Sequence, residues 1–250
     1  MTTWRVAAAQ ISSGTDVTAN LALCVSAVDA AADRGARLVV LPEAAMASFA
    51  IAPTQVAEPL DGPFASGLRE AAARRGITVV AGMFEPAADG RCFNTLLVTG
   101  PGVEASYRKV HLFDAFASRE SDTVAPGTAY ETVLIDGVTV GLATCYDVRF
   151  ADQFTELGRR GAQVVVLPAS WADGPGKAEQ WDVLTRARAL DAQAWFVGCG
   201  QARPDGVEPV KAPLGIGCSV VADPLGAVHG RLDDRPGLLV RDIDLELVAR

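Results

Sequence analysis

The chain lacks the cysteine and charge patterns that mark several protein classes. Its five cysteines, Cys24, Cys92, Cys145, Cys199 and Cys218, are odd in number, widely separated and free of any CxxC pair. This distribution argues against a disulfide framework or a zinc cage. The 22 Lys and Arg residues are outnumbered by 30 Asp and Glu residues, so the formal net charge is −8. Without a basic surface to displace counterions, nucleic-acid binding is not expected.

Long apolar runs are also missing. No run approaches the length of a membrane span, and residues 1–10 lack the charged segment and apolar stretch of a signal peptide. Half of the residues are nevertheless apolar, which allows a substantial core in 250 residues. With no linker or low-complexity segment in between, we expect one domain over residues 1–250. We also expect a cytoplasmic protein with reduced thiols and no membrane association.

Short β-branched runs alternate with helical patterns along the chain, which is typical of an α/β domain. Capping residues mark several helix ends: Thr15 or Asp16 before the first helix, Gly35 after it, and Gly76 after a helix over 63–75. The other predicted helices cover 149–160 and 177–194, and the second is expected to point Trp181, Leu184 and Leu190 toward the core. The predicted strands cover 5–11, 38–41, 77–82, 93–98, 104–108, 137–144, 195–199, 216–222 and 238–244.

One sequence pattern occurs twice. The segment Arg34-Gly-Ala-Arg-Leu-Val-Val-Leu-Pro42 is echoed by Arg160-Gly-Ala-Gln-Val-Val-Val-Leu-Pro168. Each copy follows a strand and a helix and contains a buried strand, so the whole unit recurs in the same order. The repeat predicts two pseudo-symmetric halves, arranged as a four-layer α-β-β-α sandwich with two packed sheets between helix layers.

Three reactive side chains lie at the ends of different predicted strands. Glu43 follows the strand over 38–41, Lys109 follows the strand over 104–108, and Cys145 lies where a strand turns into a helix. Each residue alone has an ordinary interpretation, as a loop carboxylate, a solvated lysine or an inert buried thiol. Strand ends in α/β folds converge on one crevice, however, so together they predict a site.

The segments around these residues resemble a known family. Leu41-Pro-Glu43, Tyr107-Arg-Lys-Val-His-Leu-Phe113 and Ala143-Thr-Cys-Tyr-Asp-Val-Arg-Phe150 are similar, in order, to the three signature segments of the carbon–nitrogen hydrolase (nitrilase) superfamily. The resemblance covers nearly the whole chain. One departure follows Phe150, where Ala151-Asp152 replaces the frequent Pro-Glu, so the next helix lacks its usual first proline.

The resemblance implies a role for each reactive residue. Glu43 is expected to be the general base, Lys109 the cation that stabilises the oxyanion, and Cys145 the nucleophile that forms a thioester. The backbone N–H of Tyr146 is expected to be a second oxyanion donor. Glu120 matches an additional glutamate that many members place beside the lysine, where it orients the lysine and the substrate.

Other residues admit alternatives. His111 with Cys145 would form a dyad of papain-like or acyltransferase type. Its place in a Lys-x-His pattern favours a supporting hydrogen-bonding role instead. We expect Asp147 and Arg149 to form a local pair at the helix start. The segments Phe93-Asn-Thr95 and Arg186-Ala-Arg-Ala189 are expected to hold structure rather than perform chemistry.

The segments are most similar to the omega-amidase and deaminated glutathione amidase branch, which releases ammonia or an amine from small dicarboxylate monoamides. We therefore predict a thiol hydrolase for a small-molecule amide, without metal or cofactor. An N-carbamoyl hydrolase, a nitrilase and a noncatalytic binding module are the alternatives. Phe116, Phe150 and Trp171 are candidate pocket walls. A homodimer or higher homo-oligomer is expected, although relatives often continue beyond the position of Arg250 into a tail that reaches a partner.

Overall fold

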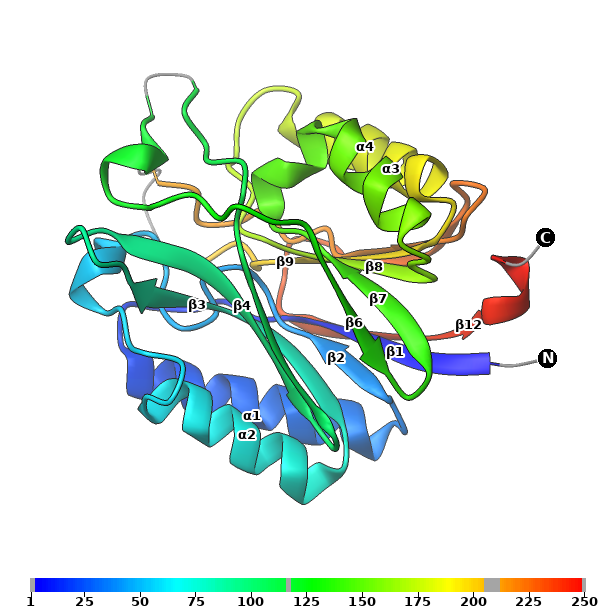
Figure 1. Ribbon diagram of the computed structural model, residues 1–250, viewed down its shortest axis with the longest axis horizontal. Helices are drawn as coiled ribbons and strands as arrows, with labels where there is room; N and C mark the ends of the chain where they lie inside the picture. The colour runs from blue at the N-terminus through cyan, green and yellow to red at the C-terminus, as the bar shows by residue number, and fades with distance from the viewer. Residues whose placement is uncertain (1–2, 116–117, 205–211, 249–250) are drawn as a thin grey trace.

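The computed structural model describes residues 3–115, 118–204 and 212–248. Within these ranges the chain forms two six-stranded sheets that pack face to face, with paired helices on both outer faces (Figure 1). This arrangement confirms the predicted α-β-β-α sandwich. No helix in the described ranges is both long enough and apolar enough to cross a membrane.

The first sheet has the strand order β12-β1-β2-β3-β4-β5. Its strands are β1 (Thr3–Gln10), β2 (Leu38–Val40), β3 (Thr78–Pro86), β4 (Cys92–Gly100), β5 (Val103–Arg108) and β12 (Gly237–Asp244). Strands β1, β2 and β3 are parallel, whereas β12, β4 and β5 pair in antiparallel fashion with their neighbours. Helices α1 (Val17–Asp33) and α2 (Pro63–Arg75) cover the outer face of this sheet (Figure 1).

The second sheet has the strand order β11-β10-β9-β8-β7-β6. Its strands are β6 (Glu131–Ile135), β7 (Val138–Leu142), β8 (Val164–Ala169), β9 (Trp195–Gly200), β10 (Val220–Ala222) and β11 (Val228–Arg231). Helices α3 (Ala151–Arg159) and α4 (Lys177–Ala192) cover its outer face (Figure 1). The short 3₁₀ helices are η1 (Pro53–Gln55), η2 (Glu120–Asp122), η3 (Cys145–Arg149) and η4 (Leu245–Leu247).

The two sheets repeat one topology, as the sequence repeat predicts. Three parallel strands linked by two helices, β1-α1-β2-α2-β3, match β7-α3-β8-α4-β9. Each set is followed by two antiparallel strands, β4 and β5 in one half and β10 and β11 in the other. One further antiparallel strand, β12 or β6, closes the opposite edge of each sheet.

Local sequence signals explain the helix ends. The Asp16 side chain accepts hydrogen bonds from the N–H groups of Thr18 and Ala19, so Asp16 is the one of the two predicted candidates that caps α1. Helix α2 begins at Pro63 and ends at Arg75, and the next residue, Gly76, adopts the left-handed conformation at φ 63° that glycine favours. These signals act within a few residues and therefore can be identified from the sequence.

The apolar core occupies three layers, one between the sheets and one under each helix pair. Parallel strands buried on both faces supply most of it, and β2 and β8 are buried along their full lengths. The layer between the sheets contains Val6, Ala8, Leu38, Val40, Val80, Leu96, Val140, Leu142, Val164, Val166 and Val197. Burying one such valine or leucine side chain contributes about 1.5–3 kcal/mol to the stability of the fold. The packed core therefore holds the strands, and the site residues at their ends, in fixed positions.

Some details of the prediction are wrong. The predicted 149–160 helix is two elements, because the chain turns through η3 before α3 begins at Ala151. Leu190 was expected to point inward but is 51% exposed. It lies nine residues after the buried Trp181, which is two and a half helical turns and hence the opposite face. The edge strands β6 and β11 were not predicted, and β10 begins only at Val220.

Candidate active site

Glu43 follows β2 and is buried, with 1% of its surface exposed. Its Oε1 accepts hydrogen bonds from Lys109 Nζ at 3.0 Å and Asn94 Nδ2 at 2.8 Å, and its Oε2 accepts one from the backbone N–H of Ser170 at 2.8 Å. Gly82 makes room for this segment, since a Cβ there would lie 2.7 Å from the Glu43 Cα. The carboxylate is therefore held in one orientation by three donors.

Lys109 follows β5 and lies between two carboxylates. Its Nζ is 3.0 Å from Glu43 Oε1 and 2.9 Å from Glu120 Oε2. Burial alone lowers the pKa of Lys109, but the negative charges of Glu120 and Glu43 outweigh burial and raise that pKa well above the usual value. Lys109 is consequently an ammonium ion at neutral pH, which can stabilise negative charge but cannot accept a proton.

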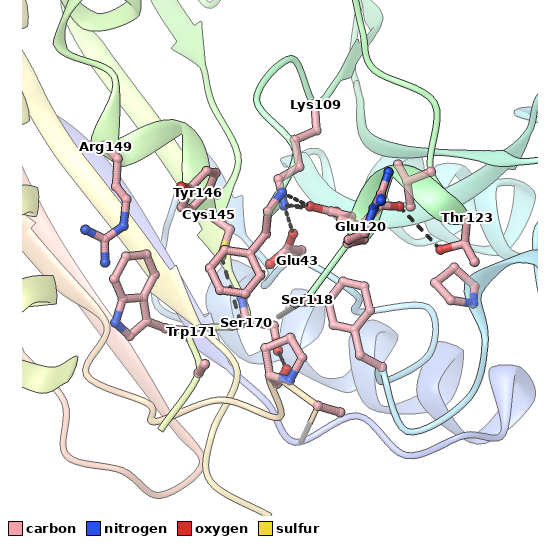
Figure 2. Close-up of a pocket in the computed structure, with 18 of the residues that line it drawn as sticks. Glu43, Lys109, Ser118, Glu120, Thr123, Cys145, Tyr146, Arg149, Ser170 and Trp171 are labelled. Carbon is pink, nitrogen blue, oxygen red and sulfur yellow. Dashed lines mark hydrogen bonds and ion pairs between the residues drawn. The ribbon is translucent and has the colours of Figure 1, made fainter. Parts of the chain in front are cut away.

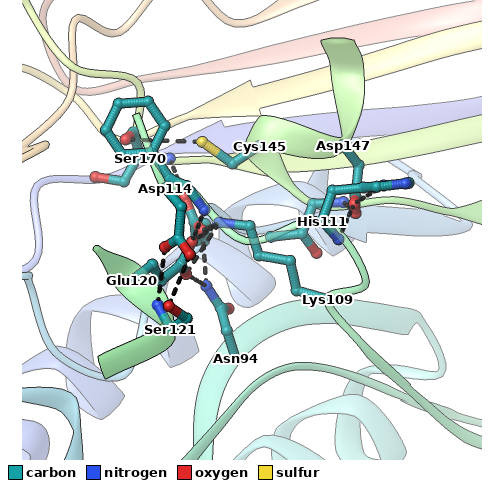
Figure 3. Close-up of polar contacts among 12 residues, drawn as sticks. Asn94, Lys109, His111, Asp114, Glu120, Ser121, Cys145, Asp147 and Ser170 are labelled. Atoms are coloured by element: carbon teal, nitrogen blue, oxygen red, sulfur yellow. Dashed lines mark hydrogen bonds and ion pairs between the residues drawn. The ribbon is translucent and has the colours of Figure 1, made fainter. Parts of the chain in front are cut away.

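Glu120 begins η2, and two sets of hydrogen bonds fix it beside the lysine (Figure 3). The backbone N–H of Phe113 donates to Glu120 Oε2 at 2.6 Å. The adjacent Ser121 donates to both oxygens of the Asp114 carboxylate, from its backbone N–H at 3.0 Å and its hydroxyl at 2.7 Å. The loop between β5 and β6 is thus braced where Glu120 meets Lys109.

Cys145 is the first residue of η3 and has a left-handed φ of 45°, an uncommon conformation for a residue with a Cβ that is often found at functional sites. Its Sγ donates to the Ser170 carbonyl oxygen at 3.8 Å. Burial and the negative charge of Glu43 raise the pKa of the Cys145 thiol well above its usual value, although Lys109 opposes them. The resting thiol is therefore protonated and needs a base.

Asp147, two residues after Cys145, is fully buried and links the lysine segment to the cysteine turn. Its Oδ2 accepts from the Tyr107 hydroxyl at 2.6 Å and the backbone N–H of Thr144 at 2.8 Å. Its Oδ1 lies 2.9 Å from His111 Nδ1 and accepts the His111 backbone N–H at 3.0 Å. His111 is therefore engaged with Asp147, and it does not line the pocket that contains Cys145.

Arg149 does not form the expected pair with Asp147. Among the described residues it donates to Gln180 Oε1 at 2.6 Å, and its guanidinium lies 5.3 Å from the Trp171 ring centroid. Lys177 Nζ lies 5.8 Å from the same ring. Burial and the neighbouring Arg149 charge lower the pKa of Lys177. Two cations therefore lie on this side of the pocket.

The reactive side chains line one pocket with a volume of about 240 Å³. In Figure 2, Arg149 and Trp171 lie on one side of Cys145, and Lys109 and Glu120 lie on the other. Apolar and aromatic side chains complete the walls, among them Phe49, Pro53, Phe113, Val124, Tyr146 and Trp171.

The three residues expected as pocket walls have different positions. Trp171 lines the pocket. Phe150 does not line it but stacks on His111 at a centroid distance of 3.7 Å. Phe116 lies outside the described residues.

Within the described ranges, no group of three or more His, Cys, Asp and Glu side chains is arranged to hold a metal ion.

The two-sheet sandwich and this pocket define a class of enzymes that cleave carbon–nitrogen bonds. The chain belongs to the carbon-nitrogen hydrolase family, whose model matches residues 5–250. The sequence prediction of the superfamily is thereby confirmed, and so is the prediction of an amidase-type hydrolase, because several relatives are named amidases.

Relatives match over most of their length. Hydrolase Rv0480c of Mycobacterium tuberculosis is 51% identical, with 98% of this chain and 91% of the relative covered. Deaminated glutathione amidase of Escherichia coli O157:H7 is 34% identical, with 92% and 87% covered. Omega-amidase NIT2 of Mus musculus is 33% identical, with 100% and 91% covered.

Solved structures show the same fold. Saccharomyces cerevisiae Nit3, a member of branch 10 of the nitrilase superfamily, superposes with a TM-score of 0.86 at 26% identity, covering 99% of this chain and 92% of that one. A mutant amidase of Nesterenkonia sp. AN1 gives a TM-score of 0.82 at 26% identity, with 98% and 92% covered. That structure shows covalent addition of the acetamide moiety of fluoroacetamide at its active-site cysteine.

Proposed function

We propose that this chain is a thiol amidase that hydrolyses a small carboxamide through a thioester on Cys145. One observation carries the proposal: the Lys109 ammonium is held 3.0 Å from Glu43 and 2.9 Å from Glu120 in the pocket that Cys145 lines. A base, a cation and a thiol thus converge around a space for one small acyl group.

The first half of the reaction forms the thioester. Glu43 takes the thiol proton as the Cys145 sulfur attacks the amide carbon, and the carbonyl π bond becomes an oxyanion. The Lys109 ammonium and the Tyr146 backbone N–H stabilise that oxyanion. When the oxyanion collapses, the C–N bond breaks, and Glu43 gives its proton to the leaving nitrogen, so that ammonia departs.

The second half reverses these roles with water. Glu43 removes a proton from a water molecule, whose oxygen attacks the thioester carbon. Collapse of the second oxyanion breaks the C–S bond, and the sulfur recovers its proton from Glu43. The product is a carboxylic acid, and the three side chains return to their starting protonation states.

The protonation states of the resting site support these assignments. The raised pKa of Lys109 keeps the amine cationic, so the lysine serves as an electrostatic group and Glu43 as the base. The raised pKa of Cys145 means that the thiol is not ionised before substrate arrives. A papain-like dyad with His111 is disfavoured, because His111 Nδ1 faces Asp147 at 2.9 Å.

The pocket favours a substrate with a negatively charged tail. Arg149 and Lys177 are both cationic and line one wall, so a carboxylate between them would relieve their mutual repulsion. The volume of about 240 Å³ suits a molecule of a few carbon atoms. We therefore propose monoamides of small dicarboxylic acids as substrates, the class predicted from the sequence.

The test is a screen for ammonia release over glutaramate-type monoamides, ketoacid amides, carbamoyl compounds, nitriles and neutral amides of equal length. We expect the anionic amides to react fastest and Cys145→Ala to abolish their hydrolysis while its melting temperature stays unchanged. Cys218→Ala is the matched control, since Cys218 does not line the pocket. Retained turnover in Cys145→Ala would reject the proposal.

The same screen separates the alternatives. Preferred turnover of carbamoyl compounds or nitriles would assign an N-carbamoyl hydrolase or a nitrilase with the same three residues. Binding of an amide without turnover would assign a noncatalytic module. The cytoplasmic location and the homodimer remain predictions from the sequence. Light scattering of the purified protein tests the dimer, for which a monomeric mass at micromolar concentration is the contrary result.

A further inference from the structure

We propose that Asn94 is a positioning residue that holds Glu43 and Glu120 around Lys109 and thereby sets the lower end of the pH range in which the site works. The inference rests on the proposed amidase function and deepens it. Figure 3 shows Asn94 pointing from its strand toward Glu120 and Lys109. From the sequence, the Phe93-Asn-Thr95 segment was expected only to hold structure.

Asn94 contacts all three charged residues of the site. It lies on β4 and is 1% exposed. Its Nδ2 donates to Glu43 Oε1 at 2.8 Å and to Glu120 Oε1 at 3.3 Å, and its backbone carbonyl accepts the Lys109 N–H at 2.8 Å. One strand residue thus connects segments that are far apart in the sequence.

The charge balance of the site explains why a neutral donor is needed there. Two carboxylates share one ammonium, so the group carries an excess negative charge in a buried place. A second cation would neutralise the excess but would weaken Glu43 as a base more than a neutral donor does. The Asn94 amide instead gives each carboxylate one hydrogen bond and leaves the net charge unchanged.

During the proposed reaction, Asn94 becomes more important for holding the two carboxylates in place. Lys109 Nζ contacts Glu43 Oε1 and both oxygens of Glu120 in the resting site. An ammonium has only three hydrogens. Lys109 must therefore give up one of these contacts when it donates a hydrogen bond to the oxyanion. Asn94 is placed to keep both carboxylates oriented while Lys109 turns toward the oxyanion.

The other atom of the Asn94 amide supports this role. Its Oδ1 is buried, and no described residue donates a hydrogen bond to it. An unpaired buried carbonyl is costly for stability, and such costs tend to occur at functional sites. Exchanging the amide nitrogen and oxygen would point the carbonyl at two carboxylates, so the orientation with Nδ2 toward them is the favourable one.

The proposal predicts a specific change in pH dependence. A hydrogen bond from a neutral donor stabilises an ionised carboxylate, so removing the Asn94 donor removes part of what holds the base in its charged form. In Asn94→Ala, the acid limb of kcat/KM should move up by about one pH unit, the size expected for one hydrogen bond to a charged group. The loss should appear in kcat more than in KM, because Asn94 does not line the pocket.

The experiment compares pH profiles of ammonia release for the wild type, Asn94→Ala, Asn94→Ser and Thr95→Val. Asn94→Ser has a hydroxyl too short to reach both carboxylates, and it serves if Asn94→Ala fails to fold. Thr95→Val is the matched control, since its buried hydroxyl bonds Glu85 at 3.3 Å outside the pocket. Its profile should coincide with that of the wild type.

A second measurement does not depend on knowing the substrate. Alkylation of Cys145 by iodoacetamide, followed by mass spectrometry, should show the same upward shift of its acid limb in Asn94→Ala. Profiles that keep the wild-type shape at a uniformly lower rate would overturn the role of Asn94. Failure of the wild type to release ammonia would overturn the proposed function instead, while the alkylation profile still tests Asn94.

Discussion

The substitution Glu120→Gln removes one of the two charges that keep Lys109 protonated. Lys109 is 3% exposed, and Glu120 contributes the largest of the electrostatic effects that raise its pKa. Glutamine keeps the shape but loses the charge, while the opposing effect of burial persists. The pKa of Lys109 must therefore fall.

A hydrogen bond between charged groups contributes about 1.5–3 kcal/mol, and one pKa unit corresponds to about 1.4 kcal/mol. The basic limb of the kcat/KM profile should therefore move down by about one to two pH units. Ammonia release followed from neutral pH to the most alkaline pH at which the protein stays folded measures it, and the limb should appear at lower pH in Glu120→Gln than in the wild type. Glu104→Gln is the control, because Glu104 pairs with Arg69 on the surface. A basic limb that stays in place, or moves to higher pH, would refute the electrostatic account of Lys109.

Three further predictions test other parts of the site. Iodoacetamide should label Cys145 before the other thiols, because Cys145 lines the pocket beside Glu43, which can take its proton, whereas Cys24, Cys92, Cys199 and Cys218 do not line the pocket. Peptide mass spectrometry showing equal labelling would contradict this. Arg149→Gln should raise the KM for anionic monoamides about tenfold to a hundredfold and leave the KM for neutral amides unchanged. Equal effects on both would contradict the proposal that Arg149 binds the substrate carboxylate. Tyr107→Phe should lower the free energy of unfolding by about 1–3 kcal/mol, since it leaves the buried Asp147 carboxylate without one of its hydrogen-bond donors. An unchanged midpoint of urea unfolding would contradict a stabilising role for the Tyr107 hydroxyl.

The position of the site follows from the pseudo-symmetry of the fold. The two repeated Leu-Pro segments, at Pro42 and Pro168, end strands β2 and β8 in opposite halves. The residues just after them, Glu43 and Ser170, meet at the pocket, where the Ser170 N–H donates to Glu43 at 2.8 Å and the Ser170 carbonyl accepts from Cys145 at 3.8 Å. The backbone of one residue of the second half, Ser170, thus contacts both the base of the first half and the nucleophile.

Much of this arrangement could be predicted from the sequence, because its signals are local. The caps of α1 and α2, the buried parallel strands and the strand-end positions of Glu43, Lys109 and Cys145 depend on neighbouring residues. The edge strands β6 and β11 were missed because most of their residues are at least partly exposed. Their sequences therefore lack the regular apolar pattern by which buried strands are recognised. The inward position predicted for Leu190 was wrong because the prediction relied on the apolar side chain. It did not take into account that Leu190 lies on the face of the helix opposite the buried Trp181.

Other features could not be predicted, because they depend on contacts between distant segments. Asn94 reaches Glu43 across 51 residues and Ser170 reaches it across 127. Asp147 was expected to pair locally with Arg149, yet Tyr107 and His111 of the other half take its oxygens. A one-dimensional pattern identifies the reactive groups, whereas the residues that orient them are determined by how the two sheets pack.

The central claim is that Cys145 carries the acyl group during turnover, with Glu43 and Lys109 acting on the same carbon. The most direct measurement is peptide mass spectrometry of the enzyme quenched in acid during hydrolysis of its best amide. The account predicts an acyl adduct confined to the Cys145 peptide, and neither adduct nor ammonia release in Cys145→Ala. An acyl group on any other side chain, or continued turnover by Cys145→Ala, would contradict it.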